Sequence, residues 1–438
     1  MKKTLSIVFL LSREHKGGHK EIDHALPFIY LLQKHLPDGL ELLKTRLIFG
    51  TYRSHLVDRA DSRIDFFKTL ENVDIVELPC PPIIGVMVRV ARQANKFLPT
   101  RPLFSLIKRF LRRYDKKHAR QAVTQVSLGD NFLNADYPLF IATNLSGSTK
   151  TVADEVRSMD PRVQFLIIPH GTIMCENEMV HDDDMGQDRN DWSNPLLNAP
   201  DKILFTSGRE KKECTAGGMR ESIGRPVGSP RYCSEWLSAK QSNELDGPLP
   251  STKSQKRNIL FLIPKRFINI WHEELERTIY FLASYPSFDI ILQGETPNYP
   301  ALSQLDNQHG NVRRLVIGQD YSSSALIDWA DVVIHAGAGV VYESYMRGKL
   351  TVLPSYITAN VFISERYDAG VYLHCRDDLR DFCNRLSASL VDARNFFYEP
   401  NRAAIERYIE DFVEKDDQSV GKNIARAIQD VTVGTDSK

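Results

Sequence analysis

The sequence predicts an α/β protein with two parallel-sheet domains that face a cleft. Short apolar runs of strand length alternate with helix-like segments along most of the chain, a pattern typical of βαβ units. The chain of 438 residues is also longer than a single core usually supports. A polar stretch at residues 238–257 interrupts the alternation. We therefore expect a first domain at 1–237, a linker at 238–257 and a second domain at 258–438.

The expected strands form two series, one in each domain. The first series lies at residues 4–11, 44–50, 73–78, 137–143, 163–168 and 202–206. The second follows a turn-rich segment, 224–232, and lies at 258–263, 287–293, 313–317, 331–334 and 350–353. Each series predicts a Rossmann-like sheet with helices on both faces. Ligands of such sheets bind at the carboxyl ends of the strands, so residues that directly follow a strand are the candidate site residues.

The composition is that of an ordinary globular protein, with 42% apolar residues, 26% charged residues and a formal net charge of zero. No apolar run approaches the roughly 20 residues that a membrane-spanning helix needs. The six cysteines are scattered, without Cys-x-x-Cys spacing. This favours free thiols in a reducing compartment over a disulfide framework or a zinc site. The sequence therefore predicts a cytoplasmic protein.

The most informative segment runs from His335 to Glu343 and reads His-Ala-Gly-Ala-Gly-Val-Val-Tyr-Glu. Gly337 and Gly339 open an expected helix, where uncovered backbone N–H groups can bind an anion such as a pyrophosphate. Glu343 could accept hydrogen bonds from ribose hydroxyls, so its removal should weaken ligand binding and hardly change stability. The dinucleotide-binding fingerprint is excluded because Tyr342 stands where that fingerprint has its third small residue.

This segment and its continuation, Gly348–Lys349 and Pro354, resemble the donor signature of inverting nucleotide-sugar glycosyltransferases of the GT-B fold, from bacterial surface-polysaccharide biosynthesis. A second match to the same family is the loop Gly17–His19, which follows the first expected strand and precedes an apolar helix. The proline usually found three residues after that His is here Pro27, eight residues on. The GT-B fold that the resemblance implies agrees with the two predicted domains.

The resemblance implies a metal-independent, inverting glycosyltransferase that uses a nucleotide sugar as substrate and no cofactor. His335 and the glycine loop would hold the diphosphate, and Glu343 the ribose. His19 would be the general base that takes the proton of the acceptor hydroxyl. The acceptor would be a surface carbohydrate, free or lipid-linked.

Further candidate residues follow other expected strands. His170 ends a strand in Pro-His-Gly and is a second candidate base. The donor side would include Lys265 and Arg266, which could neutralise phosphates, and Gly294, which would let a nucleobase approach. The loops on the acceptor side would contribute Gly17, Gly18, Asn144 and Ser146.

Three other functions fit parts of this pattern. A nucleotide-sugar 2-epimerase shares the fold, although the Gly-Thr-Arg-Pro-Glu start and the Asp-Ser-Gly-Gly loop of that family are missing here. A polyol-phosphate transferase would explain His170 but not the His335 segment. A non-catalytic carbohydrate-assembly protein would bind the donor without turning it over. Glycosyl transfer accounts for most of the motifs and is the expected function.

Two charged segments raise separate expectations. Residues 89–120 hold eleven Lys or Arg against one acid, and apolar residues between 103 and 120 fall on one helical face. Such a helix either contacts an anionic membrane surface peripherally or covers its own domain. The neutral remainder of the chain gives no support to nucleic-acid binding. The acidic run at 181–191 lacks the glycine and final Glu of a calcium loop, so no metal is expected.

Overall fold

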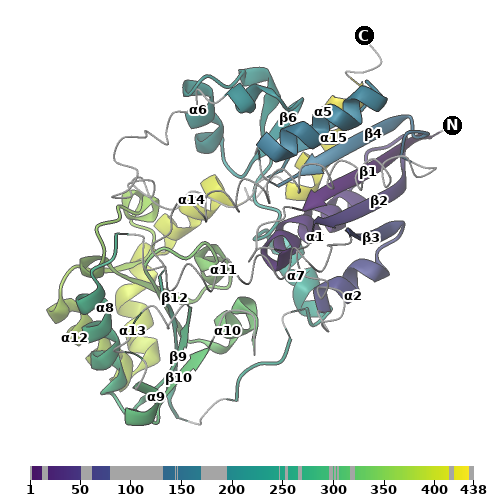
Figure 1. Ribbon diagram of the computed structural model, residues 1–438. Helices are drawn as coiled ribbons and strands as arrows, with labels where there is room; N and C mark the ends of the chain where they lie inside the picture. The colour runs from purple at the N-terminus through teal and green to yellow at the C-terminus, as the bar shows by residue number, and fades with distance from the viewer. Residues whose placement is uncertain are drawn as a thin grey trace, which may run out of the picture. The chain divides into compact units, whose positions relative to one another are not determined.

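The structure, a computed structural model, contains two compact units (Figure 1). It describes residues 2–11, 18–50, 62–78, 132–143, 145, 147–168, 195–245, 247–251, 255–264, 269–294, 299, 302, 305–315, 321–413 and 419–433. The first unit comprises Met1–His170, Trp192–Arg231 and Gln418–Lys438, and the second comprises Gly171–Asp191 and Tyr232–Asp417. Each unit is built on one parallel sheet with helices around it. The expected fold class is therefore confirmed.

The sheet of the first unit has seven parallel strands in the order β3-β2-β1-β4-β5-β6-β7. These are β1 (Lys3–Leu11), β2 (Leu40–Gly50), β3 (Val73–Leu78), β4 (Tyr137–Ala142), β5 (Gln164–Ile167), β6 (Lys202–Phe205) and β7 (Gly224–Pro226). The helices are α1 (Gly18–Lys34), α2 (Ser62–Thr69), α5 (Gly147–Met159), α6 (Gly208–Ala216) and α15 (Val420–Val433). Val8 lies in a core cluster with Val152 of α5, whereas Phe9 packs against Phe28 of α1. Because successive strand residues face opposite sides, helices cover both faces of this sheet.

The sheet of the second unit has six parallel strands in the order β10-β9-β8-β11-β12-β13. These are β8 (Arg257–Leu262), β9 (Phe288–Gln293), β10 (Val312–Leu315), β11 (Val332–His335), β12 (Leu350–Pro354) and β13 (Val371–Leu373). The helices are α7 (Ser234–Ser242), α8 (His272–Ala283), α9 (Leu305–Gln308), α10 (Ser323–Trp329), α11 (Val341–Met346), α12 (Arg376–Ala388), α13 (Leu390–Phe397) and α14 (Arg402–Phe412). Ile259 and Phe261 lie in one core cluster, and Leu260 and Leu262 in another. The strands are continuously apolar because both faces of the sheet are buried.

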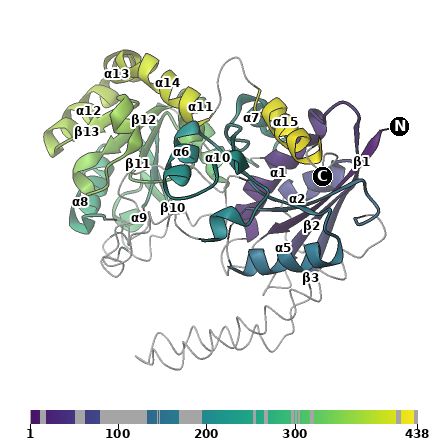
Figure 2. The ribbon, with the colours of Figure 1, turned by 90° about the horizontal axis from the view of Figure 1, so that it is seen from above.

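The two units differ from the expected domain division at two places. The last helix, α15, belongs to the first unit, where it packs against α1 (Figure 2). Gly421 lies against the His35 ring, and Arg225 forms an ion pair with Asp430 at 3.2 Å. Residues 232–257, expected to be a linker or the end of the first domain, belong to the second unit. Tyr232 is buried there in the main core cluster.

The strand order reverses once in each sheet. In the first sheet the reversal lies between β1 and β4, and in the second it lies between β8 and β11. Doubly wound sheets bind their ligands at this switch point, outside the carboxyl ends of the strands. The chain segments that follow β1, β4, β8 and β11 are therefore where the fold predicts a site.

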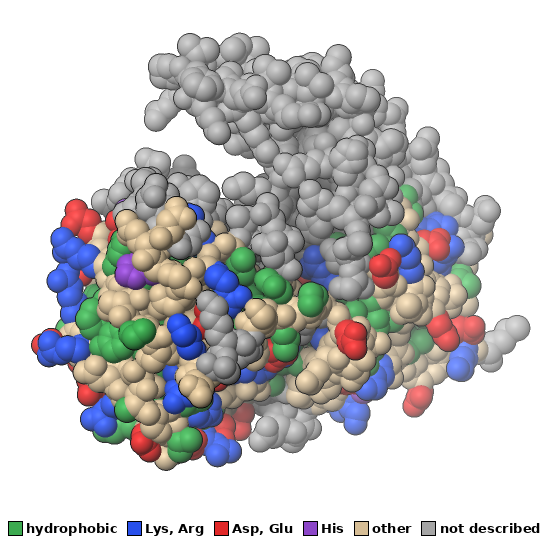
Figure 3. Space-filling view, turned by 90° about the horizontal axis from the view of Figure 1, so that it is seen from below, with side chains coloured by type: hydrophobic (Ala, Val, Ile, Leu, Met, Phe, Trp, Pro, Cys, Tyr) green, Lys and Arg blue, Asp and Glu red, His purple; other side chains and the backbone are tan. Residues whose placement is uncertain are grey.

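The two charged segments noted in the sequence, residues 103–120 and 181–191, lie outside the described residues. Among the described helices, none combines the length and the apolar character that a membrane crossing requires. The described His, Cys, Asp and Glu residues form no group that could hold a metal ion. On the side drawn in Figure 3, the basic and acidic side chains of the described residues are interspersed.

Candidate functional site

The loop between β11 and α11 lies at the switch point of the second sheet. His335 is the last residue of β11, and α11 begins at Val341. Between them, Gly337, Ala338 and Val340 are partly exposed and Gly339 is exposed. The four predicted donor residues of this segment are thus grouped around one loop and the helix that follows it. The helix is only six residues long, so its dipole adds little to the attraction for an anion.

His335 is a buried, neutral side chain. Its residue is 1% exposed, and its ring lies edge-on to Phe362 with the centroids 5.9 Å apart. Burial lowers the pKa of His335 to about 3, so the imidazole carries no charge at neutral pH. The Nδ1 atom accepts a hydrogen bond from the Gly337 N–H at 3.4 Å, which leaves the proton on Nε2. Among the described residues this buried Nε2 has no hydrogen-bond partner. At neutral pH the buried imidazole is therefore a neutral hydrogen-bond donor and not a cation.

The structure explains why a glycine stands at 337 but not why one stands at 339. Gly337 has a φ of +103°, a conformation that residues with a side chain rarely adopt. Gly339 has no such φ, and a Cβ atom built on it would meet no atom within 4 Å. Neither backbone conformation nor packing within the described residues requires a glycine at 339. A role for Gly339 in binding a ligand stays a prediction.

Glu343 lies in a buried network of charges. Its side chain is 2% exposed. Its Oε1 atom accepts hydrogen bonds from Arg347 Nη2 at 2.6 Å and Nε at 3.1 Å, and from Lys240 Nζ at 3.3 Å. Its Oε2 atom accepts one from the Ser324 hydroxyl at 2.8 Å. Arg347 also forms an ion pair with Asp328.

This network keeps Glu343 ionised. Burial by itself would raise the pKa of Glu343, but the positive charges of Lys240 and Arg347 and the hydrogen bonds from Ser324 and Arg347 hold it below its usual value. The carboxylate is therefore an anion with most of its acceptor positions already occupied by the protein. A ribose hydroxyl, the partner expected from the sequence, would have to share this carboxylate with them.

Gly294 follows β9 and is explained by packing alone. It has a φ of +154°, and a Cβ atom there would lie 2.6 Å from Cβ and 2.8 Å from the carbonyl oxygen of Ile263. Ile263 directly follows β8, the neighbouring strand. The close approach of two strand ends requires this glycine whether or not a nucleobase binds nearby.

The remaining predicted residues fall largely outside the described part of the chain. Gly18 and His19 open α1 after the first strand, and their side-chain surroundings are not described. The residues outside the described ranges are Gly17, Asn144, Ser146, His170, Lys265 and Arg266. In the sequence they follow β1, β4, β5 and β8. Their roles stay predictions.

Three members of the Glu343 network were not predicted from the sequence. Arg347 stands four residues after Glu343 on α11, a spacing at which helical side chains meet, so it could have been found. Ser324 comes from α10 and Lys240 from α7, the latter 103 positions from Glu343. Only the fold brings these two side chains to the carboxylate.

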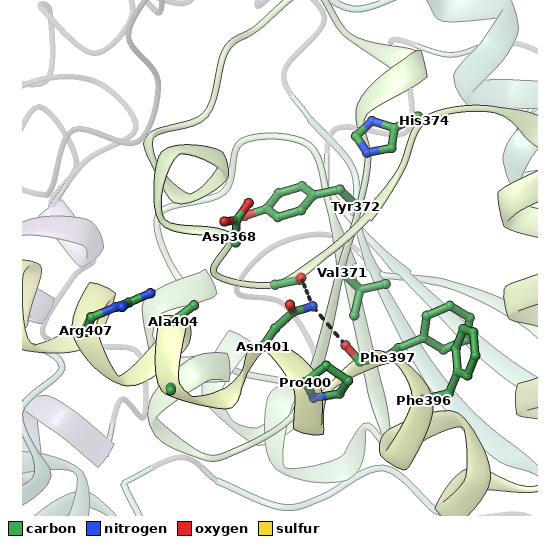
Figure 4. Close-up of a pocket in the computed structure, with 12 residues that line it drawn as sticks. Asp368, Val371, Tyr372, His374, Phe396, Phe397, Pro400, Asn401, Ala404 and Arg407 are labelled. Atoms are coloured by element: carbon green, nitrogen blue, oxygen red, sulfur yellow. Dashed lines mark hydrogen bonds between the residues drawn. The ribbon is translucent and has the colours of Figure 1, made fainter.

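A separate pocket of about 470 Å³ lies in the same unit between β13 and the α13–α14 segment (Figure 4). Asn401 reaches across its floor and donates hydrogen bonds to the carbonyls of Gly370 and Phe397. Phe396 lies at one side and Arg407 at the other. None of the residues predicted from the sequence lines this pocket.

Comparison with solved structures finds the same fold in UDP-GlcNAc 2-epimerases. The enzyme of Neisseria meningitidis, solved with UDP-GlcNAc bound, is 13% identical with a TM-score of 0.57, over 98% of this chain and 100% of that one. The Methanocaldococcus jannaschii enzyme is 10% identical with a TM-score of 0.55, over 98% and 100%. The Rickettsia bellii enzyme is 11% identical with a TM-score of 0.52, over 99% and 96%. No protein-family model and no curated protein matches the chain.

These similarities confirm the fold and correct the expected reaction. The chain shares a fold of two parallel-sheet α/β domains with these enzymes along nearly its whole length. The expectation of an inverting glycosyltransferase is wrong, because the similar structures are epimerases, which need no acceptor. The motif on which that expectation rested could not distinguish the two reactions. A glycine loop and a buried Glu predict how a nucleotide is held, and they contain no information on what happens to its sugar.

Proposed function

We propose that this protein is a nucleotide-sugar epimerase that binds a UDP-sugar and inverts one carbon of the sugar. The observation that carries this proposal is the end-to-end similarity to UDP-GlcNAc 2-epimerases, 98% of this chain against 100% of the Neisseria meningitidis enzyme. A match over the whole length of both chains favours the same class of ligand. The glycine loop at the switch point of the second sheet supports it independently.

The second unit would hold the nucleotide. The loop at Gly337–Gly339 lies where dinucleotides and nucleotide sugars bind in doubly wound sheets. The Nε2–H of His335 is a donor that lacks a partner among the described residues, and a phosphate oxygen or a bound water would satisfy it. Glu343, which is ionised, would accept from a hydroxyl group through its less occupied oxygen, Oε2.

The first unit would supply the proton transfers. Inverting a carbon centre that carries a hydrogen requires a base that removes the proton and an acid that returns one to the other face. The electron pair of the broken C–H bond would form a double bond to the anomeric carbon as UDP leaves, and UDP would add back when the proton returns. His19 at the start of α1 and His170 after β5 are the candidates that the sequence offers for this work. A His is suited to both roles because its ordinary pKa lies near neutrality.

The experiment that tests this function combines binding with product analysis. A panel of UDP-, GDP- and dTDP-sugars is first screened for stabilisation of the protein. Each sugar that stabilises it is then incubated with the protein, without any acceptor, and the products are separated as epimers. We expect a UDP-sugar to raise the melting temperature and to yield its epimer. Stabilisation without an epimer would identify a binding protein, and the absence of both would overturn the proposal.

A further inference from the structure

We infer that Lys240 is a positioning residue of the nucleotide site. From its helix, Lys240 holds the Glu343 carboxylate in place and thereby orients the glycine loop. The inference rests on the proposed function and deepens it. Lys240 lies on α7, the first helix after the chain enters the second unit at Tyr232. Nothing in its sequence surroundings marks it as part of a site.

The contacts of Lys240 are buried and directional. Its side chain is 15% exposed, and its Nζ atom lies 3.3 Å from Oε1 of Glu343. The same ammonium group donates a hydrogen bond to the hydroxyl of Ser324. Ser324 in turn donates to the other oxygen of Glu343 at 2.8 Å. Lys240 therefore fixes both carboxylate oxygens of Glu343: it contacts Oε1 directly and Oε2 through Ser324.

The charges of the network show why a second cation is needed. Arg347 pairs with two carboxylates, those of Glu343 and Asp328. The guanidinium of Arg347 is thus shared between two anions, of which Glu343 is the buried one, and an uncompensated buried charge is costly. Lys240 supplies the second positive charge. Without Lys240, the Glu343 side chain would move or would take up a proton.

A second contact joins the same segment to the same helix. The ring of Tyr232 stacks on that of Tyr342, with centroids 5.8 Å apart and an angle of 27° between the planes. Tyr342 directly precedes Glu343, and both belong to the first turn of α11. Residues 232–242 thus hold this turn at two consecutive positions. Because α11 begins directly after Gly339 and Val340, fixing its first turn also fixes the loop.

The test is a comparison of two buried cation–carboxylate pairs in one unit. Lys240→Met removes the charge next to Glu343. Arg313→Met is the matched control, because Arg313 pairs at 3.0 Å with the fully buried Asp289 at the amino end of β9, the sheet edge opposite to the loop. Dissociation constants for UDP are measured by calorimetry on each full-length variant, with melting temperatures recorded in parallel. Lys240→Gln replaces Lys240→Met should the latter fail to fold.

We expect Lys240→Met to weaken UDP binding roughly tenfold, the lower end of the loss seen when residues that support metal ligands are removed. Arg313→Met should lower the melting temperature and leave the dissociation constant within about twofold. In a Glu343→Gln background, which lacks the anion, Lys240→Met should have little further effect on binding. Lys240→Arg should recover part of the affinity because it restores the charge.

Two results separate this inference from the proposed function. Unchanged UDP binding by folded Lys240→Met or Lys240→Gln would overturn the positioning role, while UDP binding by the unaltered protein would still support the nucleotide site. Equal losses in Lys240→Met and Arg313→Met would also overturn it, since they would show a general effect of destabilisation. A failure of the unaltered protein to bind UDP would instead remove the proposed function, and the inference with it.

Discussion

Arg347 donates two hydrogen bonds to a single carboxylate oxygen of Glu343, from Nη2 at 2.6 Å and from Nε at 3.1 Å. The two residues are four positions apart on α11, and the Glu343 side chain is 2% exposed. Such a pair adds little to stability compared with apolar residues of the same size. Its function is better understood as geometric, because it fixes the position of the carboxylate on the helix that follows the glycine loop.

Glu343→Ala should destabilise the protein substantially, which corrects the expectation from the sequence. The substitution leaves the side chains of Lys240 and Arg347 without their shared anion in a buried site. Removing one partner of a buried ion pair typically costs about 3–5 kcal/mol. Urea unfolding measures this cost, with Glu213→Ala as the control, since Glu213 forms a half-exposed pair with Arg209. A loss below about 1 kcal/mol for Glu343→Ala would contradict the network described here.

Gly339→Val should impair ligand binding without impairing the fold. A Cβ atom at this position meets nothing within 4 Å, and the backbone is not in the left-handed region. We expect a change in unfolding free energy within about 0.5 kcal/mol, the usual range for a surface substitution. The dissociation constant for UDP should rise clearly in calorimetry, because the new side chain occupies the space of an approaching phosphate. Wild-type affinity in this variant would exclude the loop from the site.

Gly294→Ala should show the opposite behaviour. Its Cβ atom would lie 2.6 Å from Cβ and 2.8 Å from the carbonyl oxygen of Ile263, and its φ is +154°. Overpacking of this kind costs about 1–3 kcal/mol, and the strained backbone adds about 1–3 kcal/mol. The melting temperature should fall markedly, whereas Gly339→Ala in parallel should leave it unchanged. A stable Gly294→Ala variant that no longer bound UDP would instead assign Gly294 to the ligand.

His335 should make the protein sensitive to acid. Burial lowers the pKa of His335 to about 3, against 6.5 for an unperturbed His. Between these values the unfolded chain binds a proton that the folded chain does not, so stability falls as the pH drops below 6.5. The loss is about 1.4 kcal/mol per pH unit, or roughly 2 kcal/mol between pH 6.5 and pH 5.

His335→Gln tests this prediction because Gln keeps a donor and does not titrate. Unfolding free energies of both proteins are measured at pH 7 and pH 5. The absolute stability of the variant is not decisive. The difference between the two pH values should be smaller in His335→Gln by roughly 2 kcal/mol. Equal pH dependence in both proteins would show that His335 titrates normally and is not buried as described.

Most of the fold could be predicted from the sequence because its strands are buried on both faces. The run Asn258–Ile263 is almost wholly apolar, and the structure places β8 within one residue of it. The expected strand at 73–78 is reproduced as β3. Two strands were missed, β7 (Gly224–Pro226) and β13 (Val371–Leu373), each of three residues. Segments this short carry no detectable period.

The site was less predictable, because its geometry depends on contacts between distant residues. The glycine loop could be found from its own residues, since backbone exposure is a local property. The partners of Glu343 could not, as Lys240 lies 103 positions away and on a helix outside the sheet. Local sequence also could not show that Gly294 serves the packing of Ile263. The reaction could not be predicted from the sequence either, because residues that bind a nucleotide are common to enzymes that transfer a sugar and enzymes that rearrange it.

Solvent exchange tests most directly whether this protein epimerises a nucleotide sugar. The protein is incubated with UDP-GlcNAc in D2O, without acceptor, and the sugar protons are followed by NMR. Inversion through removal and return of a proton replaces one carbon-bound hydrogen with solvent deuterium. We predict loss of the proton signal at a single sugar carbon, together with the appearance of the epimer. Retention of every sugar proton during prolonged incubation, for UDP-GlcNAc and for each UDP-sugar that stabilises the protein, would contradict the account.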